Sequence, residues 1–122
     1  MCIRDSRFSA QEHRFGIHAG EIETSMMLHL APATVRMEKA QNFRSTSQDR
    51  SERYAILGNG KSAKLGWQMQ DYHPAGAVGD AAAATADKGQ AVVDAAAQQL
   101  VELLQELQAL PLSTLASGPD LG

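Results

Sequence analysis

The stretch TADKGQAVVDAAAQQLVELLQELQAL, residues 85–110, decides the fold class of this chain. Its apolar residues recur in alternating steps of four and three, which places them on one face of a helix. These residues are Gly89, Val93, Ala96, Leu100, Leu103, Leu107 and Leu110. Thr85 is the expected N-cap, and Pro111 is expected to end the helix. An apolar face of this length has to be buried against a sheet or other helices, so the fold needs a second layer.

A second helix is predicted over residues 21–30, because Ile22, Met26 and Leu30 recur every four residues and form an apolar stripe. The two glutamates in its first turn suit the positive end of the helix dipole. A proline two residues after its end stops it. Most of the large apolar side chains therefore fall on helix faces.

The rest of the chain carries weaker signals. Residues 7–17 are expected to be an extended lead-in, and residues 44–53, which contain no apolar side chain, a solvated loop. Residues 65–72 alternate in a way that indicates a short strand, and residues 73–80 are expected to form an irregular loop. One or two short strands cannot cover a long helix face. The partner layer is thus predicted to be missing from this chain or to come from another subunit.

The composition indicates a thin hydrophobic core. The chain has 122 residues, which is enough for one domain at most. Although 43% of the residues are hydrophobic, Leu, Ile, Val and Phe supply only about one fifth of the chain. Alanine, which buries little area, supplies much of the remainder. We interpret this as the composition of part of a domain.

The charge balance excludes two classes of partner. There are 11 basic and 14 acidic residues, and the resulting net charge of −3 offers no positive surface to nucleic acid or to an anionic membrane. No apolar run approaches the roughly 18 residues of a membrane span. The single cysteine, Cys2, cannot build a disulfide framework, so a reducing, cytoplasmic location is expected.

The first six residues, MCIRDS, lack the apolar segment of a signal peptide and resemble a translated sequencing adapter. The native chain is therefore expected to begin upstream. Residues 1–13 are interpreted as a non-native or disordered lead-in, residues 14–112 as the domain portion, and residues 113–122 as a disordered tail.

The densest group of chemically active side chains is HAGEIETS, residues 18–25. His18 stands just before the second helix, and Glu23 lies about 100° around that helix from its apolar face. An imidazole and a carboxylate at a helix N-terminus could hold a metal ion, an anion or an oxyanion. On spacing alone, the commoner explanation is structural: the carboxylates complement the helix dipole, and His18 is a loop residue.

Two further residues are candidates for substrate contact. Trp67, close to Tyr72, fits a substrate platform, although an isolated tryptophan in a small domain is more often a packing residue. His73, before Pro74, fits loop packing and substrate contact equally well. No phosphate-binding loop, serine-hydrolase elbow or Cys-x-x-Cys motif occurs in the sequence.

The stretch HAGEIETSMML, residues 18–28, resembles the H-[AG]-G-x-x-E-T-S-x-M-L segment of the creatininase (creatinine amidohydrolase) family. The resemblance continues through residues 66–71 and through GAVGD, residues 76–80, which leads to ATADKG, residues 84–89. Altogether it covers about residues 14–112. Three residues depart from the family pattern: Ala77, Ala81 and Asp87 stand where valine, proline and glutamate are common.

This resemblance implies an α/β fold, of which the chain would be the C-terminal part. The parent domain would be a three-layer α/β/α structure with a mostly parallel sheet, and the visible part would be mainly helical with one or two short strands. The implied activity is metal-dependent hydrolysis of C–N bonds in small cyclic amides or formamides, in a homo-hexamer. His18 would be the proton shuttle and Glu23 a metal-associated carboxylate, with Trp67 and His73 in loops over the substrate.

The same resemblance places most of the metal ligands outside this chain. The family carries them in an E-x-H segment, an aspartate soon after it and an N-G-H segment, none of which occurs here. The divalent ions, zinc, manganese or iron, would be bound mostly by missing residues, so the parent is expected to be an enzyme and this chain alone inactive. The alternative is a non-enzymatic interaction module that docks through the helix at residues 85–110.

Overall fold

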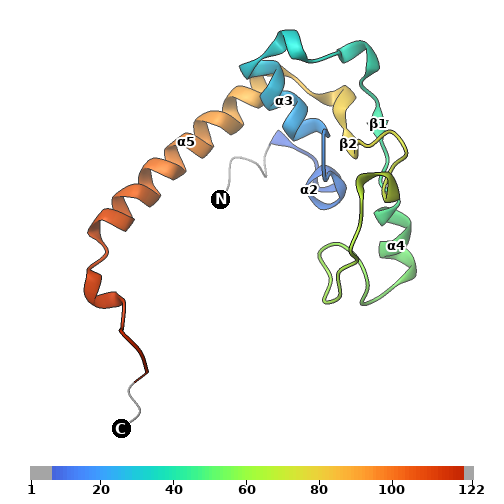
Figure 1. Cartoon of the computed structure of the whole chain (residues 1–122). Helices are drawn as coiled ribbons and strands as arrows, with labels where there is room; N and C mark the ends of the chain where they lie inside the picture. Colours follow the sequence, from blue (N-terminus) through green and yellow to red (C-terminus); the bar gives the residue numbers. More distant parts are fainter. Residues whose placement is uncertain (1–6, 120–122) are drawn as a thin grey trace.

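The computed structural model describes residues 7–119, so Cys2 and the adapter-like start lie outside the described residues. Figure 1 shows a small body from which one long helix extends. The α-helices and strands are α2 (Ala10–Phe15), α3 (Glu21–Leu30), β1 (Asn42–Phe43), α4 (Ser47–Arg53), β2 (Gly79–Asp80) and α5 (Ala86–Ala109). The 3₁₀ helices are η1 (Pro32–Thr34), η2 (Met37–Lys39), η3 (Met69–Asp71), η4 (Ala81–Ala83) and η5 (Leu112–Thr114). The prediction of a mainly helical chain with one or two short strands is confirmed.

The N-terminal end of α5 packs on α3, and polar contacts fix the crossing. Thr85 caps α5 as predicted, because its hydroxyl accepts a hydrogen bond from the backbone N of Lys88 at 3.3 Å. The fully buried Ser25 hydroxyl accepts from the backbone N of Thr85 at 3.1 Å. Lys88 Nζ lies 2.5 Å from the buried carboxylate of Glu21. The first turns of the two helices are therefore tied together.

Gly89 allows the two backbones to touch. A Cβ atom at this position would overlap the backbone carbonyl of Ser25 on α3. Only glycine leaves room for such an approach. Within the sequence ATADKG, Thr85 thus supplies the cap, Lys88 the ion pair and Gly89 the close contact that hold α5 on α3.

The strands form a two-stranded antiparallel sheet, in which Asn42 lies opposite Asp80 and Phe43 opposite Gly79. An isolated bridge between His18 and Val78 extends the pairing beside it. The mostly parallel sheet was predicted for the parent domain, and this antiparallel pair is the sheet that residues 7–119 form.

The strand predicted over residues 65–72 is not observed. The end of this segment instead forms η3, where the backbone N of Gln68 donates to Asp71 at 2.8 Å and a reciprocal capping box closes the turn. Alternation alone does not make a strand when no neighbouring strand pairs with it, so this prediction is wrong.

The extended lead-in predicted over residues 7–17 is also wrong in part, because Ala10–Phe15 form α2. The hydroxyl of Ser9 caps this helix by accepting from the backbone N of Glu12 at 3.0 Å. Phe8 is buried, and so is the side chain of Glu12. Long-range contacts, rather than local periodicity, hold this segment in place.

Residues 44–53, predicted as a solvated loop, contain α4. Arg44 forms a two-point ion pair with Asp49, at 2.5 and 3.1 Å, across the start of the helix. The hydrogen bond from Arg44 holds the pKa of the Asp49 carboxyl below its usual range. An exposed polar helix is thus supported by charge pairing instead of an apolar face.

Replacing Asp49 by Asn should lower the melting temperature slightly at neutral pH and flatten the acid dependence of stability. Because the folded pKa of Asp49 is lowered, the stabilisation is present above the unfolded pKa of about 3.9 and is lost as pH falls through the folded value. Thermal melts from pH 2 to 7 would measure this. Asp94→Asn, at an exposed position on α5, is the control, and identical acid profiles for the two variants would contradict the prediction.

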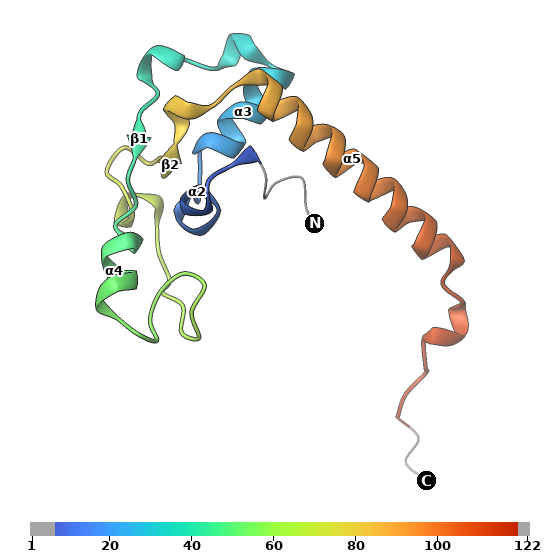
Figure 2. The same ribbon diagram turned by 180° about the vertical axis from the view of Figure 1, so that it is seen from behind.

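The distal half of α5 is exposed, in contrast to its start, which packs on α3. Both views show this helix running away from the body (Figures 1 and 2). Of its predicted apolar face only Gly89, next to α3, is buried. Val92 is buried there instead of the predicted Val93, which is half-buried. Seven large apolar residues farther along are exposed: Leu100, Val101, Leu103, Leu104, Leu107, Leu110 and Leu112. Between residues 7 and 119, no helix has the length and apolarity that crossing a bilayer requires.

Candidate functional site

His18 and Glu23 meet at the start of α3. The Nδ1 atom of His18 lies 3.2 Å from Oε2 of Glu23, and each side chain is a little over half exposed, at 57% and 53%. The same carboxylate oxygen accepts a hydrogen bond from the backbone N of Ala19 at 2.7 Å. Ala19 has a positive φ of 53°, a left-handed conformation that is uncommon outside glycine. The turn between His18 and the helix therefore brings the imidazole back over the first turn.

This arrangement orients the imidazole. When Nδ1 carries the proton and donates it to Glu23, Nε2 is left to exchange a proton with a bound molecule. The Thr24 hydroxyl donates to the carbonyl of Ala19 at 3.2 Å and braces the same turn. The pair can act as a positioned acid–base group. The proximity of the two predicted residues is observed, whereas their catalytic role stays a prediction.

An open cavity of about 460 Å³ adjoins this pair. One part of its wall comes from α3, and another part comes from the segment that connects α3 to β1. Its lining is largely apolar. The lining residues besides His18 and Glu23 are Ala19, Thr24, Met27, Thr34, Val35, Arg36, Lys39, Ala40, Phe43, Ala77 and Ala81. A small organic molecule fits a space of this size and lining.

The two predicted substrate-contact residues do not line this cavity. Trp67 is 45% exposed and packs edge-on against the fully buried Tyr72, with ring centroids 5.0 Å apart. His73 packs edge-on against Phe43 at 5.4 Å, and Phe43 itself lines the cavity. His73 thus contacts the site through a neighbour, and Trp67 packs in the loop region beyond it.

The described part of the chain does not build a metal centre. Nowhere in residues 7–119 do three His, Cys, Asp or Glu side chains gather closely enough to hold an ion. His18 and Glu23 could supply two donors at most, whereas structural and catalytic zinc sites take at least three protein ligands. A metal ion does not fit these residues alone.

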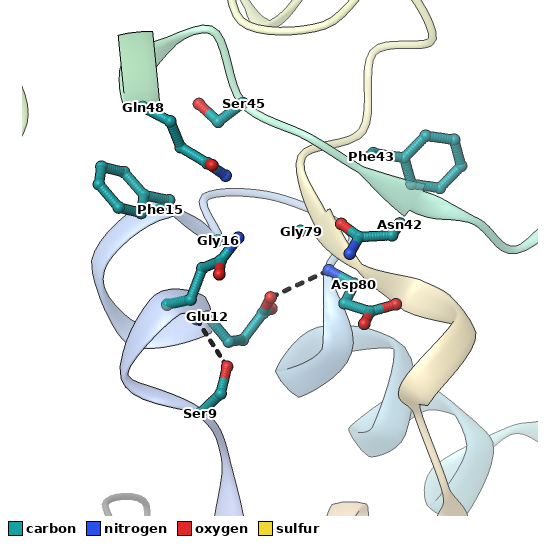
Figure 3. Close-up of a pocket in the computed structure, with 11 residues that line it drawn as sticks. Ser9, Glu12, Phe15, Gly16, Asn42, Phe43, Ser45, Gln48, Gly79 and Asp80 are labelled. Atoms are coloured by element: carbon teal, nitrogen blue, oxygen red, sulfur yellow. Dashed lines mark hydrogen bonds between the residues drawn. The ribbon is translucent and has the colours of Figure 1, made fainter. Parts of the chain in front are cut away.

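A buried carboxylate that the sequence did not reveal holds the site's framework. Glu12 accepts from the backbone N of Glu21 at 2.7 Å and from the backbone N of Asp80 at 2.9 Å, and so joins the start of α3 to β2. Gly20, the N-cap of α3, offers no side chain, so Glu12 takes over the capping role. Figure 3 shows Glu12 pointing toward Asp80, beside Gly79.

A small cavity of about 100 Å³ opens over Glu12, between α2 and the two strands (Figure 3). Both oxygens of the carboxylate are engaged by backbone donors. Glu12 is therefore a structural group. Little in the sequence points to this role of Glu12. The one related feature is the glycines at 16, 20 and 79, each of which leaves space that the Glu12 carboxylate fills.

Sequence reasoning also missed two cations at the larger cavity, Arg36 and Lys39. They lie more than ten residues from His18 along the chain and belong to no motif. Folding of the segment after α3 brings them to the cavity wall.

Comparison with known proteins gives three findings. The model of one family, Creatininase, described as creatinine amidohydrolase, matches residues 2–104. The match includes most of residues 1–13, whose interpretation as a lead-in stays a prediction. No protein of curated function matches the chain.

The third finding is a structural similarity. A crystal structure from Bacteroides fragilis, of a protein whose assignment as a creatinine amidohydrolase is itself provisional, superposes with a TM-score of 0.61. The sequences are 24% identical over 85% of this chain. The aligned region is 41% of that protein, so the chain spans well under half the length of this relative. This likeness supports the fold, as a portion of a creatininase-like α/β domain.

Proposed function

We propose, because this chain belongs to the creatininase (creatinine amidohydrolase) family, that it contributes the acid–base part of an amidohydrolase site. The family suggests an amidohydrolase-type function. We further propose that the substrates are small cyclic amides or formamides and that a C–N bond is cleaved. The observation that carries this proposal is the His18–Glu23 pair at the edge of a 460 Å³ cavity.

The pair suits the proton transfer that amide hydrolysis needs. Water adds to the carbonyl carbon, the C–N bond breaks, and the nitrogen leaves as an amine that has gained a proton. His18 Nε2 would deliver that proton, while Glu23 holds Nδ1 and keeps the ring in place. Ala19 N fixes Glu23 in turn, so the ring is supported by backbone. The apolar lining would limit the access of bulk water.

The family is generally metal-dependent, and we propose that the parent protein binds divalent zinc, manganese or iron. Since the described residues offer two donors at most, the remaining ligands would come from outside this chain. This proposal agrees with the chain's coverage of 41% of its structural relative. The parent would be the enzyme, and this chain alone would be inactive.

The decisive test uses a protein that carries this chain together with the rest of a creatininase-like domain, obtained by recovering the flanking coding sequence. We expect it to open the ring of creatinine by hydrolysis of its cyclic amide, or to release an amine from a formamide, and His18→Ala to lower kcat by at least about 100-fold. His29→Ala, in the last turn of α3 and away from the cavity, is the matched control. Retention of activity by His18→Ala would refute the assigned role.

The isolated chain should bind zinc or manganese only weakly. Two donors leave the ion mostly hydrated, so a calorimetric titration is expected to show no tight stoichiometric phase. His18→Ala should remove the residual binding, and His29→Ala should not. Tight binding of one ion per chain would show that the ligand set is complete here and would contradict the fragment interpretation.

We also propose that the parent is a cytoplasmic homo-oligomer, a hexamer by resemblance to the family. The single cysteine among the 122 residues supports a reducing location. The alternative function, an interaction module that docks through α5, gains no support from the family match, which covers residues 2–104 and thus most of the chain.

A further inference from the structure

We propose that Arg36 and Lys39 form an anion-binding subsite, so that the molecule bound in the cavity carries a carboxylate or phosphate group in addition to its amide. This inference rests on the proposed function, because it specifies the class of amide that the same cavity accepts. It follows from the position of the two cations at the cavity and from the lack of partners for their side chains within the described part of the chain.

Both cations line the cavity and belong to the part of its wall formed by the segment that connects α3 to β1. Arg36 is the N-cap of η2 and Lys39 is its last residue, and the backbone N of Lys39 donates to the carbonyl of Arg36 at 2.9 Å. This short turn separates the two cations by three residues, and both of them line the cavity, while Glu38, between them in sequence, does not.

Neither cation is neutralised by the protein. The ion pairs within residues 7–119 are His18–Glu23, Arg44–Asp49 and Lys88–Glu21, and over the same residues the side chains of Arg36 and Lys39 have no ion pair, hydrogen bond or ring contact.

The carboxylate that lines the cavity is already engaged. Glu23 accepts from Ala19 N at 2.7 Å and lies 3.2 Å from His18 Nδ1. Two positive side chains consequently face the cavity without a protein counter-charge, in a chain whose net charge is −3.

The chemistry of the wall selects an oxygen anion. A guanidinium presents a planar fork that matches a carboxylate or phosphate, and an ammonium adds a second, adaptable charge. The same cavity is also lined by apolar residues that suit the carbon skeleton of a small molecule, among them Met27, Val35 and Phe43. The cavity thus offers an anion subsite, an apolar middle and a proton-transfer group. A neutral amide would leave the anion subsite unused.

The test is a titration of the 122-residue chain with a matched pair of amides, N-acetylglycine, which is anionic, and N-acetylglycinamide, which is neutral, followed by NMR or calorimetry. We expect the anion to bind roughly tenfold more tightly, since two partly exposed charge contacts contribute about fivefold or less each. Arg36→Gln and Lys39→Gln should each reduce this preference by a few-fold, and added salt should weaken it.

Lys64→Gln removes an exposed cation that does not line the cavity and is the control for net charge. The preference should survive in that variant and vanish in the Arg36→Gln/Lys39→Gln double variant. Inorganic phosphate that competes with N-acetylglycine more strongly than acetate does would support the subsite and assign it to phosphate-bearing ligands.

Equal binding of the two amides by the unchanged chain, or a preference that persists in the double variant, would overturn the subsite. Binding is read without hydrolysis, so that failure would leave the role of His18 to be judged by its own activity test. Conversely, an inactive parent that still binds the anionic amide selectively would remove the proposed function and keep the anion subsite.

Discussion

Replacing Gly89 with alanine is expected to lower the free energy of unfolding by about 3 kcal/mol, near the upper end of what overpacking costs. The added methyl group would overlap the backbone carbonyl of Ser25, which cannot move aside as a flexible side chain could. The helices would have to separate, which would strain the Thr85–Ser25 and Lys88–Glu21 contacts. The gain in helix propensity from glycine to alanine, about 1 kcal/mol, does not offset this loss. Denaturant unfolding followed by circular dichroism would measure the change.

Gly66→Ala is the matched control, because nothing lies within 4 Å of a Cβ atom at that position. We expect the control to change stability by less than about 0.5 kcal/mol. If Gly89→Ala were as stable as the unchanged chain, α3 and α5 could not cross as closely as described.

Replacing Glu12 with alanine should cost about 3 kcal/mol as well. The change leaves the backbone N–H groups of Glu21 and Asp80 without their acceptor, and an unsatisfied buried donor costs about 1–3 kcal/mol. The start of α3 would lose its only cap, because Gly20 supplies none. Thermal and denaturant unfolding would report the loss, and broadening of the His18 signals in NMR spectra would show that the site loosens with it.

Two further variants separate the capping role of Glu12 from simple packing. Gln11→Ala, at the exposed neighbouring position of α2, should be close to neutral. Glu12→Gln keeps the volume but replaces one acceptor oxygen by a donor, so it should also destabilise the chain. A fully stable Glu12→Gln variant would mean that the carboxylate fills space and caps nothing.

The two long helices were predictable because their signals are local. The apolar periodicity and the residues that begin and end each helix all lie within or beside residues 21–30 and 85–110. Local signals also indicated that His18 and Glu23 lie near each other, because they are only five residues apart and flank the start of a helix.

The features that were missed depend on partners far along the chain. Helix α2 is six residues long, and Glu12 gains its role only when Glu21 and Asp80 arrive. Helix α4 has no apolar face and relies on Arg44 and Asp49. The apolar face of α5 was predicted correctly as a pattern, but the layer that would bury its distal half is not among the described residues.

Two long-range hydrogen bonds also close a large loop of the chain. The hydrogen bond from Asp80 N to Glu12 spans 68 positions, and that from Thr85 N to Ser25 spans 60. The segment from the end of α3 to the start of η4 is therefore one large loop. The interactions where its two ends meet, at the neck of the loop, have to offset the entropy lost on closing it. The wall that carries Arg36 and Lys39 lies within this loop, whereas the wall that carries Glu23 lies at its neck. The cavity therefore depends on closure of this loop, and a ligand that contacts both walls would stabilise the folded chain against global unfolding.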